Sequence, residues 1–363
     1  MASIPFLKKI NFPALFGGSR SRVVGIDVGM FSTKVIQLRY DRERAILETY
    51  GELLNSAYFK DKDISGAAFL RSNDNDFAAL LKDILRASNV TTREGIFSVP
   101  ASSSFITPIS LPFFSEKEIE NTIPFEARKF IPIPISEVVL NWEILETNQE
   151  HDRIEVLLTA VPREVVDKFK RVASLAGIHL ASLEVETFSV ARALVGRDPT
   201  TTAILDLGQH TSNIIIADRA KVDLSHTITR GSGEISRALE RGLGVSSERA
   251  EGVKRDVGLS EKIEEREIVS AITPLLHVLF SEVERVISLY NRKSPRHIQK
   301  LNITGGGSNL KGIIEFAASF FGIEVVRGNP FSRLVVPAFM QPILRDIGPN
   351  FSTAIGLALH REK

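Results

Sequence analysis

Hydrophobic positions along the first hundred residues follow two spacings. The apolar run VVGID, the short turn GMFST and the apolar run KVIQL predict two strands joined by a tight turn, and AILETYGEL continues the strand pattern as a meander. In residues 76–88 the large apolar side chains recur every three or four positions, which predicts an amphipathic helix. GIFSVP then predicts a buried strand that ends at Pro100. Alternating strands and helices of this kind predict an α/β fold.

A second set of strands and helices follows Ala101. The extended segment ITPISLPFF, the helical segment SEKEIENTIPFEARKF and two further strands precede a helix that has Pro162 at its start and Gly177 at its end. This order of elements over residues 103–185 predicts a compact inserted module.

The opening pattern returns in the second half of the chain. Aligning Asp27 with Asp206 of TAILDLGQHTSNIIIAD puts Gly29 on Gly208, and hydroxyl residues stand three and four positions after each glycine. Apolar strands flank both copies. The two copies are too far apart for a solenoid, so the repeat predicts two related structural units.

The remaining pattern completes a division into domains. Residues 267–293 keep a helical spacing, and NITGGGSNL predicts a buried strand, a glycine turn and a helix that begins near Asn309. We expect a flexible N-terminal segment and four further parts, the last helix of the second lobe packing back on the first lobe. The parts are 1–21 (segment), 22–102 with 186–200 (first lobe), 103–185 (insert), 201–230 with 300–363 (second lobe) and 231–299 (second small subdomain).

Composition narrows the classes of function. The 363 residues are 43% hydrophobic, enough for more than one core, and 45 basic against 44 acidic residues leave a net charge of +1. This balance gives no basic footprint for nucleic acid. The absence of cysteine excludes disulfides and thiolate metal sites and indicates a reducing compartment, and the seven histidines form no HExxH pair. No apolar run reaches the roughly 18 to 20 residues of a membrane span.

The N-terminal stretch MASIPFLKKINFPALFGG leaves two interpretations open. Pro5 and Pro13 interrupt its apolar residues and no long hydrophobic region follows Lys8 and Lys9, so it is a poor signal peptide. It is either a loose tail or a short amphipathic contact for a membrane surface or a partner.

The turn in GIDVGMFSTK has the residue types of a phosphate site. A tight turn points successive backbone N–H groups into one hollow that attracts phosphate oxygens, and Gly29 lets the backbone approach closely. Lys34 can add a positive charge, and Asp27 can hold Mg²⁺ through water. An ordinary hairpin explains the same residues, so the prediction depends on the second copy at Asp206 and Gly208.

Two further stretches suit the rest of a nucleotide. The glycines Gly305 to Gly307 leave no side chains, so a flat ring or a sugar can lie against the backbone, and the N-terminus of the following helix adds partial positive charge. A tight strand-to-helix connection explains one or two of these glycines but not a third. Glu251 and Lys254, three positions apart on one helix face, form either a surface salt bridge or a hydrogen-bonding pair for a ribose.

Together these elements resemble the actin-type ATPase superfamily, in which two related domains each carry an Asp-x-Gly phosphate turn and a late glycine turn meets adenosine. The resemblance runs from about Val23 to the last helix. Within the superfamily the chain is most similar to the PilM family of type IV pilus assembly proteins, through SVPASSSFITPISLPFF, VLLTAVPREVVDKFKRVASLAGIHLASLEVETFSVARAL and LNITGGGSNLKGI. This implies an α/β actin-like ATPase fold of two related lobes, with an inserted FtsA/PilM-type (SHS2) subdomain at residues 103–185.

The resemblance also implies how ATP or ADP is bound between the two lobes. Asp27 and Asp206 would hold Mg²⁺ through water. The residues implied for the phosphates are Gly29, Met30, Phe31, Ser32, Thr33, Lys34, Gly208, Gln209, His210 and Thr211. Those implied for the ribose and base are Gly233, Glu251 and Lys254, and those for adenosine are Gly305, Gly306, Gly307 and Ser308.

One position departs from the family pattern. Met30 stands where related proteins usually carry Ser or Thr, whose hydroxyl can meet the terminal phosphate. The backbone amide remains, so we expect nucleotide binding with at most slow ATPase activity. No catalytic residue is assigned: Gln209 and His210 are candidates for water activation by position alone, and a contact within the turn is the other interpretation of each.

The resemblance implies a cytoplasmic platform at the inner face of the cytoplasmic membrane. Its partner would be a PilN-like inner-membrane protein, bound through its N-terminal cytoplasmic peptide in a groove between the first lobe and the insert. Other pilus assembly proteins and self-association are further candidates, and contact with the membrane would be indirect.

Two alternatives stay open. An FtsA-like division protein is expected to carry an amphipathic membrane-binding helix at its C-terminus, where the printed sequence reads GLALHREK. A kinase of the same superfamily that acts on a small metabolite would need a catalytic carboxylate in a substrate pocket, and no motif supplies one.

Overall fold

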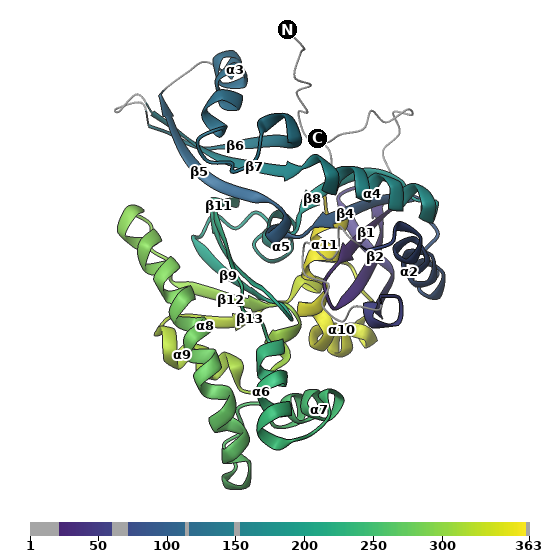
Figure 1. The fold of residues 1–363 in the computed structure, drawn as a ribbon. Helices are drawn as coiled ribbons and strands as arrows, with labels where there is room; N and C mark the ends of the chain where they lie inside the picture. The colour runs from purple at the N-terminus through teal and green to yellow at the C-terminus, as the bar shows by residue number, and fades with distance from the viewer. Residues whose placement is uncertain (1–21, 60–71, 113–115, 149–152, 361–363) are drawn as a thin grey trace. The chain divides into compact units, whose positions relative to one another are not determined.

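The computed structural model describes residues 22–59, 72–112, 116–148 and 153–360, so the N-terminal segment 1–21 lies outside the described residues. The chain divides into two compact units (Figure 1). The first comprises Met1–Ser189, Asp223–Ser225 and Thr353–Lys363, and the second comprises Val190–Val222 and His226–Ser352.

The first unit is built on a five-stranded sheet in the order β3-β2-β1-β4-β8. The first three strands form the expected antiparallel meander, whereas β4 and β8 run parallel to β1. Because β1 and β4 are buried on both faces, their sequences are continuous apolar runs. The strands are β1 (Arg22–Val28), β2 (Ser32–Asp41), β3 (Arg44–Leu54), β4 (Glu94–Val99) and β8 (His179–Val185).

Helices cover this sheet on both faces. On one face α2 (Asp74–Ala87) and α4 (Arg163–Ala176) share an apolar core, in which the rings of Phe77 and Phe169 lie 6.5 Å apart. On the other face α11 (Ser352–Ala358) approaches β1 so closely that a Cβ on Gly25 would be 2.1 Å from the carbonyl oxygen of Ala354. The glycine within VVGID is therefore required by helix packing.

A buried ion pair joins the two helices α2 and α4. Lys168 of α4 is 2% exposed, and its amino group donates hydrogen bonds to the carbonyl oxygen of Ser72 at 2.6 Å and to Asp74 Oδ1 at 3.0 Å. Arg171 donates to the other oxygen of the same carboxylate at 2.7 Å. Burial works against the charge of Asp74, but the hydrogen bonds from Arg171 and Lys168 outweigh it and lower the pKa of Asp74.

The insert has a separate three-stranded antiparallel sheet in the order β5-β7-β6, with a core of its own. It consists of β5 (Phe105–Pro112), α3 (Glu116–Ala127), β6 (Val138–Asn148) and β7 (Arg153–Pro162). The elements α4 and β8 were expected within the insert of residues 103–185, but they pack with the five-stranded sheet because the apolar stripe of α4 faces that core. We propose that the compact part of the insert ends near Pro162.

The second unit repeats the strand order of the first. Its sheet runs β11-β10-β9-β12-β13, so the central strand β9 pairs with an antiparallel neighbour on one side and a parallel one on the other, as β1 does. The repeat seen in the sequence thus extends to the topology of a whole sheet. The strands are β9 (Thr202–Leu207), β10 (Ser212–Asp218), β11 (Lys221–Ile228), β12 (Lys300–Thr304) and β13 (Glu324–Arg327).

The helices of the second unit are α6 (Gly233–Leu243), α7 (Ser247–Val257), α8 (Arg266–Lys293), α9 (Ile313–Phe321) and α10 (Gln341–Ile347), and α5 (Glu186–Leu194) leads from the first unit into the second. Helices α8 and α9 lie beside this sheet, and α6 and α7 lie beyond one end of it (Figure 1). Within the described residues, no helix has the length and apolarity that a membrane crossing requires.

The prediction of a helix beginning near Asn309 is wrong. Gly306–Asn309 form a 3₁₀ turn, and α9 begins only at Ile313. Gly312 has a φ of +79°, a left-handed conformation that cannot continue a helix backwards toward the glycine turn. The partial positive charge of the N-terminus of α9 is therefore not adjacent to the triple glycine.

Candidate functional site

The first candidate turn, Gly29 to Phe31, joins β1 and β2 in a hairpin that pairs Asp27 with Lys34. A Cβ on Gly29 would be 2.9 Å from the carbonyl oxygen of Ser32, so the turn is tight enough to require glycine. Gly29 and Met30 are half-buried and Phe31 is exposed. The backbone of this turn is the part that remains open to a ligand.

The hydroxyl groups that follow the turn are already bonded within the protein. Ser32 Oγ donates to Glu52 Oε1 at 2.6 Å, and Thr33 Oγ1 donates to Asn55 Oδ1 at 2.9 Å. Asn55 Nδ2 in turn donates to the carbonyl oxygen of Gly29 at 2.7 Å, and both hydroxyl residues are buried. These side chains therefore hold the shape of the turn, and their hydroxyls are used within the protein.

Asp27 lies buried at the end of β1. Its Oδ1 accepts a hydrogen bond from Ser98 Oγ at 2.9 Å, and its Oδ2 lies 3.8 Å from Lys34 Nζ. Burial raises the pKa of Asp27, while Lys34 and Ser98 act in the opposite direction. Lys34 also lies 4.0 Å from Glu52 Oε1, so its charge is shared between two carboxylates.

The second candidate turn, Gly208 to Thr211, joins β9 and β10 in the second unit. The N–H of Gly208 donates to the carbonyl oxygen of Thr211 at 3.1 Å, and a Cβ on Gly208 would be 2.7 Å from that oxygen. Gln209 and His210 at its tip are half-buried. The same steric requirement for glycine therefore recurs at the equivalent position of the repeat.

The N-terminal end of α6 packs against this second turn. The N–H groups of Ser232 and Gly233 donate to the carbonyl oxygens of Gly208 at 2.9 Å and Gln209 at 2.8 Å. A Cβ on Gly231 would be 2.6 Å from the carbonyl group of Gln209. This contact accounts for Gly233 and for the backbone of Gln209, in line with the interpretation of Gln209 as a contact within the turn.

The three consecutive glycines after β12 differ in what requires them. Gly305 has a φ of +79°, and a Cβ there would be 2.4 Å from Asp206 Oδ1. A Cβ on Gly307 would be 2.3 Å from Leu207 Cγ. Gly306 is exposed, and the nearest atom to a Cβ there would lie 4.0 Å away. The fold thus requires two of the glycines, whereas the third, Gly306, has open space where a side chain would stand.

Glu251 and Lys254 of α7 form an ion pair in which the lysine is buried and the glutamate is partly exposed. Lys254 Nζ lies 2.6 Å from Glu251 Oε2 and donates to Ser236 Oγ of α6 at 2.9 Å. Burial lowers the pKa of Lys254 although Glu251 opposes this. Burial also works against the charge of Glu251, but Lys254 and Ser236 outweigh it, so the pKa of Glu251 is lowered. The pair ties α7 to the start of α6.

Magnesium would find few direct ligands on this chain. Among residues 22–59, 72–112, 116–148 and 153–360, no three acidic or histidine side chains converge on one point. Mg²⁺ commonly keeps several waters and takes one or two carboxylates together with phosphate oxygens. Asp27 lies at the end of the central strand of the first unit, and Asp206 at the end of the central strand of the second.

Sequence reasoning missed the residues that support the two turns. Glu52, Asn55 and Ser98 hold the first turn and its aspartate, and Gly231 and Ser232 hold the second. Each lies between 20 and 71 positions from at least one partner, so no local spacing reveals it.

Comparison with known proteins gives the family. A sequence profile described as type IV pilus assembly protein PilM matches residues 25–362. The chain belongs to this family. A curated relative, the cell division protein FtsA of Rhizobium meliloti (strain 1021), is 26% identical over 182 residues, which cover 44% of this chain and 40% of FtsA. The matched segment thus spans less than half of that protein's length.

Solved structures confirm the predicted fold class. The PilM-PilN type IV pilus biogenesis complex has a TM-score of 0.78 at 23% identity and covers 93% of this chain and 97% of that chain. MreB5 of Spiroplasma citri bound to AMPPNP has a TM-score of 0.53 at 12% identity, with 93% and 95% covered. The ethanolamine utilization protein EutJ of Carboxydothermus hydrogenoformans also has 0.53, at 17% identity, with 93% and 89% covered. The α/β fold of this PilM-family chain is therefore actin-like.

Proposed function

We propose that this PilM-family chain binds ATP or ADP with Mg²⁺ and acts as a nucleotide-dependent platform in type IV pilus assembly. The observation that carries the proposal is the repeated hairpin turn after an Asp-x-Gly strand end, with the same steric need for glycine at Gly29 and Gly208. The structural likeness to MreB5 bound to AMPPNP supports it, since that protein shares the fold.

In this proposal the backbone does most of the phosphate binding. The N–H groups of Gly29 to Phe31 and of Gly208 to Thr211 bind the phosphates, and Lys34 adds a point charge. Ser32 and Thr33 act indirectly, because their hydroxyls hold the first turn in shape. Asp27 and Asp206 hold Mg²⁺ through water, and the metal neutralises the phosphate charge.

The second unit supplies the nucleoside side of the proposed site. The open face of Gly306 lets a flat base or a sugar lie against the backbone, and Ser308 fixes the turn by donating its hydroxyl to the carbonyl oxygen of Gly305 at 2.7 Å. Glu251 and Lys254 of α7 contact Ser232 and Ser236 at the start of α6, near Gly233, and carboxylate and ammonium groups suit ribose hydroxyls.

We propose that nucleotide is turned over slowly if at all. Met30 offers a backbone amide but no hydroxyl to the terminal phosphate, and a charge-stabilising donor is worth about a hundredfold or more in rate where its loss has been measured. Bound nucleotide would then act by stabilising one conformation of the protein, since a ligand shifts a conformational equilibrium only when it binds one conformation more tightly than another.

The partner we propose is the cytoplasmic N-terminal peptide of a PilN-like inner-membrane protein, with the chain held at the cytoplasmic face of the membrane through it. The likeness to the PilM-PilN complex supports this. Calorimetry with the PilN peptide and a scrambled peptide of the same composition tests it. We expect a one-to-one complex with the first peptide only; no heat and no complex at high concentration would count against this partner.

Calorimetric titration with ATP, with and without Mg²⁺, tests the nucleotide site. Asp27→Asn and Asp206→Asn each remove one charge with little change of shape, and we expect a loss of affinity of at least about tenfold in Mg²⁺ that shrinks in EDTA. Asp167→Asn, an exposed carboxylate on α4, is the matched control and should bind as wild type. Unchanged affinity in both site variants would remove the site.

A further inference from the structure

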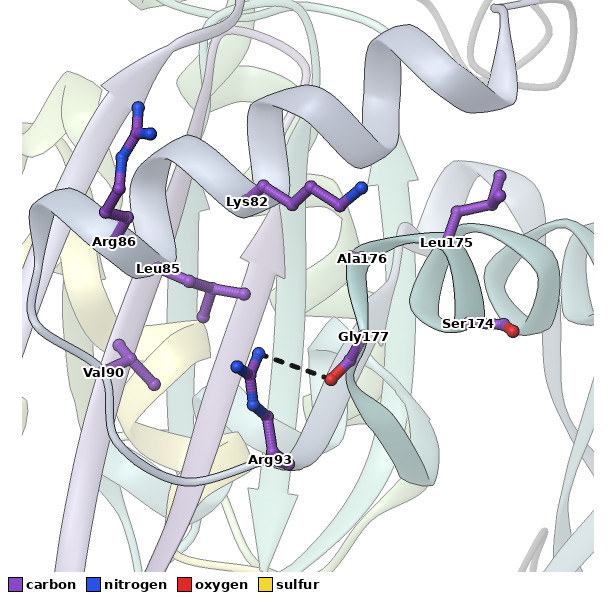
Figure 2. A pocket seen from close by; sticks show the side chains of 9 residues that line it. All are labelled: Lys82, Leu85, Arg86, Val90, Arg93, Ser174, Leu175, Ala176 and Gly177. Atoms are coloured by element: carbon purple, nitrogen blue, oxygen red, sulfur yellow. Dashed lines mark hydrogen bonds between the residues drawn. The ribbon is translucent and has the colours of Figure 1, made fainter.

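A cavity of about 750 Å³ lies in the first unit, where the C-terminal ends of α2 and α4 meet, and none of its lining residues belongs to either turn (Figure 2). Its apolar lining comes from Leu85 of α2, Val90 of the following loop and Leu175 of α4. Leu85 is buried, but Leu175 is 44% exposed, although it is a large apolar side chain on a well-packed helix. The cavity therefore offers an apolar floor that the first unit itself leaves open.

Basic side chains surround this apolar floor. Lys82 extends from α2 toward α4, Arg86 follows one turn later, and Arg93 reaches toward the end of α4, where it donates to the carbonyl oxygen of Gly177 at 3.5 Å (Figure 2). Arg86 is paired with Asp83 at 2.8 Å. Among the residues that the structure describes, no carboxylate lies within ion-pair distance of Lys82 or Arg93. The cavity thus joins apolar surface to two uncompensated positive charges.

The second unit carries a feature of the opposite kind. Ile263, at the start of a 3₁₀ turn before α8, is 73% exposed, and the neighbouring Glu261 and Glu264 are exposed acids without an ion pair in the described part of the chain. The turn is held in place, because the N–H of Glu265 donates to the carbonyl oxygen of Lys262 at 3.2 Å. The result is a fixed apolar side chain between two acidic ones.

A second anchor fixes the same loop to its own unit. The N–H of Leu259 donates to the carbonyl oxygen of Lys311 at 2.8 Å, and Gly258 packs so closely against Lys311 that a Cβ would be 2.6 Å from that oxygen. A loop held this way presents Ile263 with little loss of conformational entropy on docking, which favours association.

We propose that the Ile263 turn of one copy of this chain docks in the Lys82–Arg93 cavity of a second copy. Ile263 covers the apolar floor, and Glu261 and Glu264 meet the cations that lack a partner. The cavity is larger than one isoleucine side chain, so the turn itself enters it. Because the cavity and the turn are different surfaces, each copy retains one free cavity and one free turn, and the contact is head-to-tail.

Sedimentation velocity over a series of concentrations, with purified full-length chain, tests this contact. Wild type should associate with a dissociation constant on the order of 0.1 mM, as expected of a small interface. High salt should weaken this association, because the charge pairs are screened. Lys82→Glu and Glu264→Lys should each weaken association at least tenfold. Lys170→Glu, on α4 but outside the cavity, is the matched control and should associate as wild type.

Mixing the two charge-reversal variants gives the decisive measurement. The Glu264→Lys chain keeps its cavity and the Lys82→Glu chain keeps its turn, so an equimolar mixture should associate through this intact pair at about the wild-type strength, although each variant alone associates weakly. Circular dichroism and ATP titration check that both variants are folded and bind nucleotide as wild type does. A wild type that stays monomeric up to about 0.5 mM, variants that associate normally, or a mixture that stays monomeric would each overturn the proposal, whatever the nucleotide result.

Discussion

The three glycines after β12 allow the fold and the ligand to be separated by single substitutions. Alanine at each position adds one Cβ atom, and the structure gives the atoms nearest to it. At Gly305 it meets Asp206 Oδ1 at 2.4 Å, at Gly307 it meets Leu207 Cγ at 2.3 Å, and at Gly306 nothing lies nearer than 4.0 Å. Three chemically identical changes in one turn therefore have three different expected results.

The expected magnitudes follow from these contacts. Gly305→Ala forces alanine into a backbone conformation (φ +79°, ψ 170°) that is essentially restricted to glycine, at about 1 to 3 kcal/mol, and adds overpacking against Asp206 of about 1 to 3 kcal/mol. Gly307→Ala adds only the overpacking against Leu207, about 1 to 3 kcal/mol. Gly306→Ala removes freedom from the unfolded chain without a clash, so its free energy of unfolding should stay level or rise by up to about 1 kcal/mol.

Urea unfolding and ATP calorimetry on the same preparations measure both effects. Gly306→Ala should keep its unfolding midpoint yet bind ATP at least about tenfold more weakly, because its methyl group stands where the nucleoside would lie. Gly242→Ala, in α6 with open space around it, is the control: it should gain about 1 kcal/mol of stability from helix propensity and bind ATP normally. If Gly306→Ala binds ATP as wild type does, no nucleoside rests on this turn, and the third glycine has no such role.

Three further predictions concern the ion pair between Lys168 and Asp74 and the first turn. Lys168→Met should cost about 2 to 3 kcal/mol in urea unfolding, since it leaves Asp74 with Arg171 alone, whereas Lys170→Met on the exposed side should change stability by under about 0.5 kcal/mol; equal effects would contradict the role of burial. The lowered pKa of Asp74 contributes stability above its unfolded value of 3.8 that is lost as the pH falls through the lower folded pKa, so the wild-type midpoint should drop more steeply there than that of Asp74→Asn; parallel curves would contradict this. Met30→Ser should raise single-turnover ATP hydrolysis about a hundredfold with little change in affinity, and an unchanged rate would show that the missing hydroxyl does not limit turnover.

The strands and helices that sequence periodicity predicts best are those whose neighbours lie close along the chain. The β1–β2 hairpin, α2 and the repeat at Asp206 follow from local patterns, and the topology bears out each. The sheet against which α4 and β8 pack does not follow from local patterns. An apolar stripe shows that a helix is buried, but it does not show which sheet covers it. The start of α9 was missed for a local reason. Gly312 has a φ of +79°, and the sequence does not distinguish such a glycine from one with ordinary dihedral angles.

The candidate site divides in the same way. Gly29, Gly208 and Gly305 could be found because a glycine at a tight turn is visible in sequence, and each proves sterically required. The burial of Lys254 could not be predicted, since a glutamate and a lysine three positions apart give the same sequence pattern whether the lysine is exposed or buried. Burial depends on α6, which no helical spacing within α7 can report.

The hydroxyl residues of the repeat show why motif reading and structure differ at this site. Thr33 and Ser212 are equivalent positions, and both are fully buried. Thr33 Oγ1 donates to Asn55 Oδ1 just after β3, and Ser212 Oγ donates to the carbonyl oxygen of Arg230 just after β11. In each unit, then, the hydroxyl ties the turn between the first two strands to the segment that follows the third. A phosphate-binding turn needs such a hydroxyl even when the hydroxyl does not contact the phosphate. A turn that binds through its backbone must first be held in one conformation. The side chain that can vary without loss of that shape is the one at the tip, and Met30 occupies it.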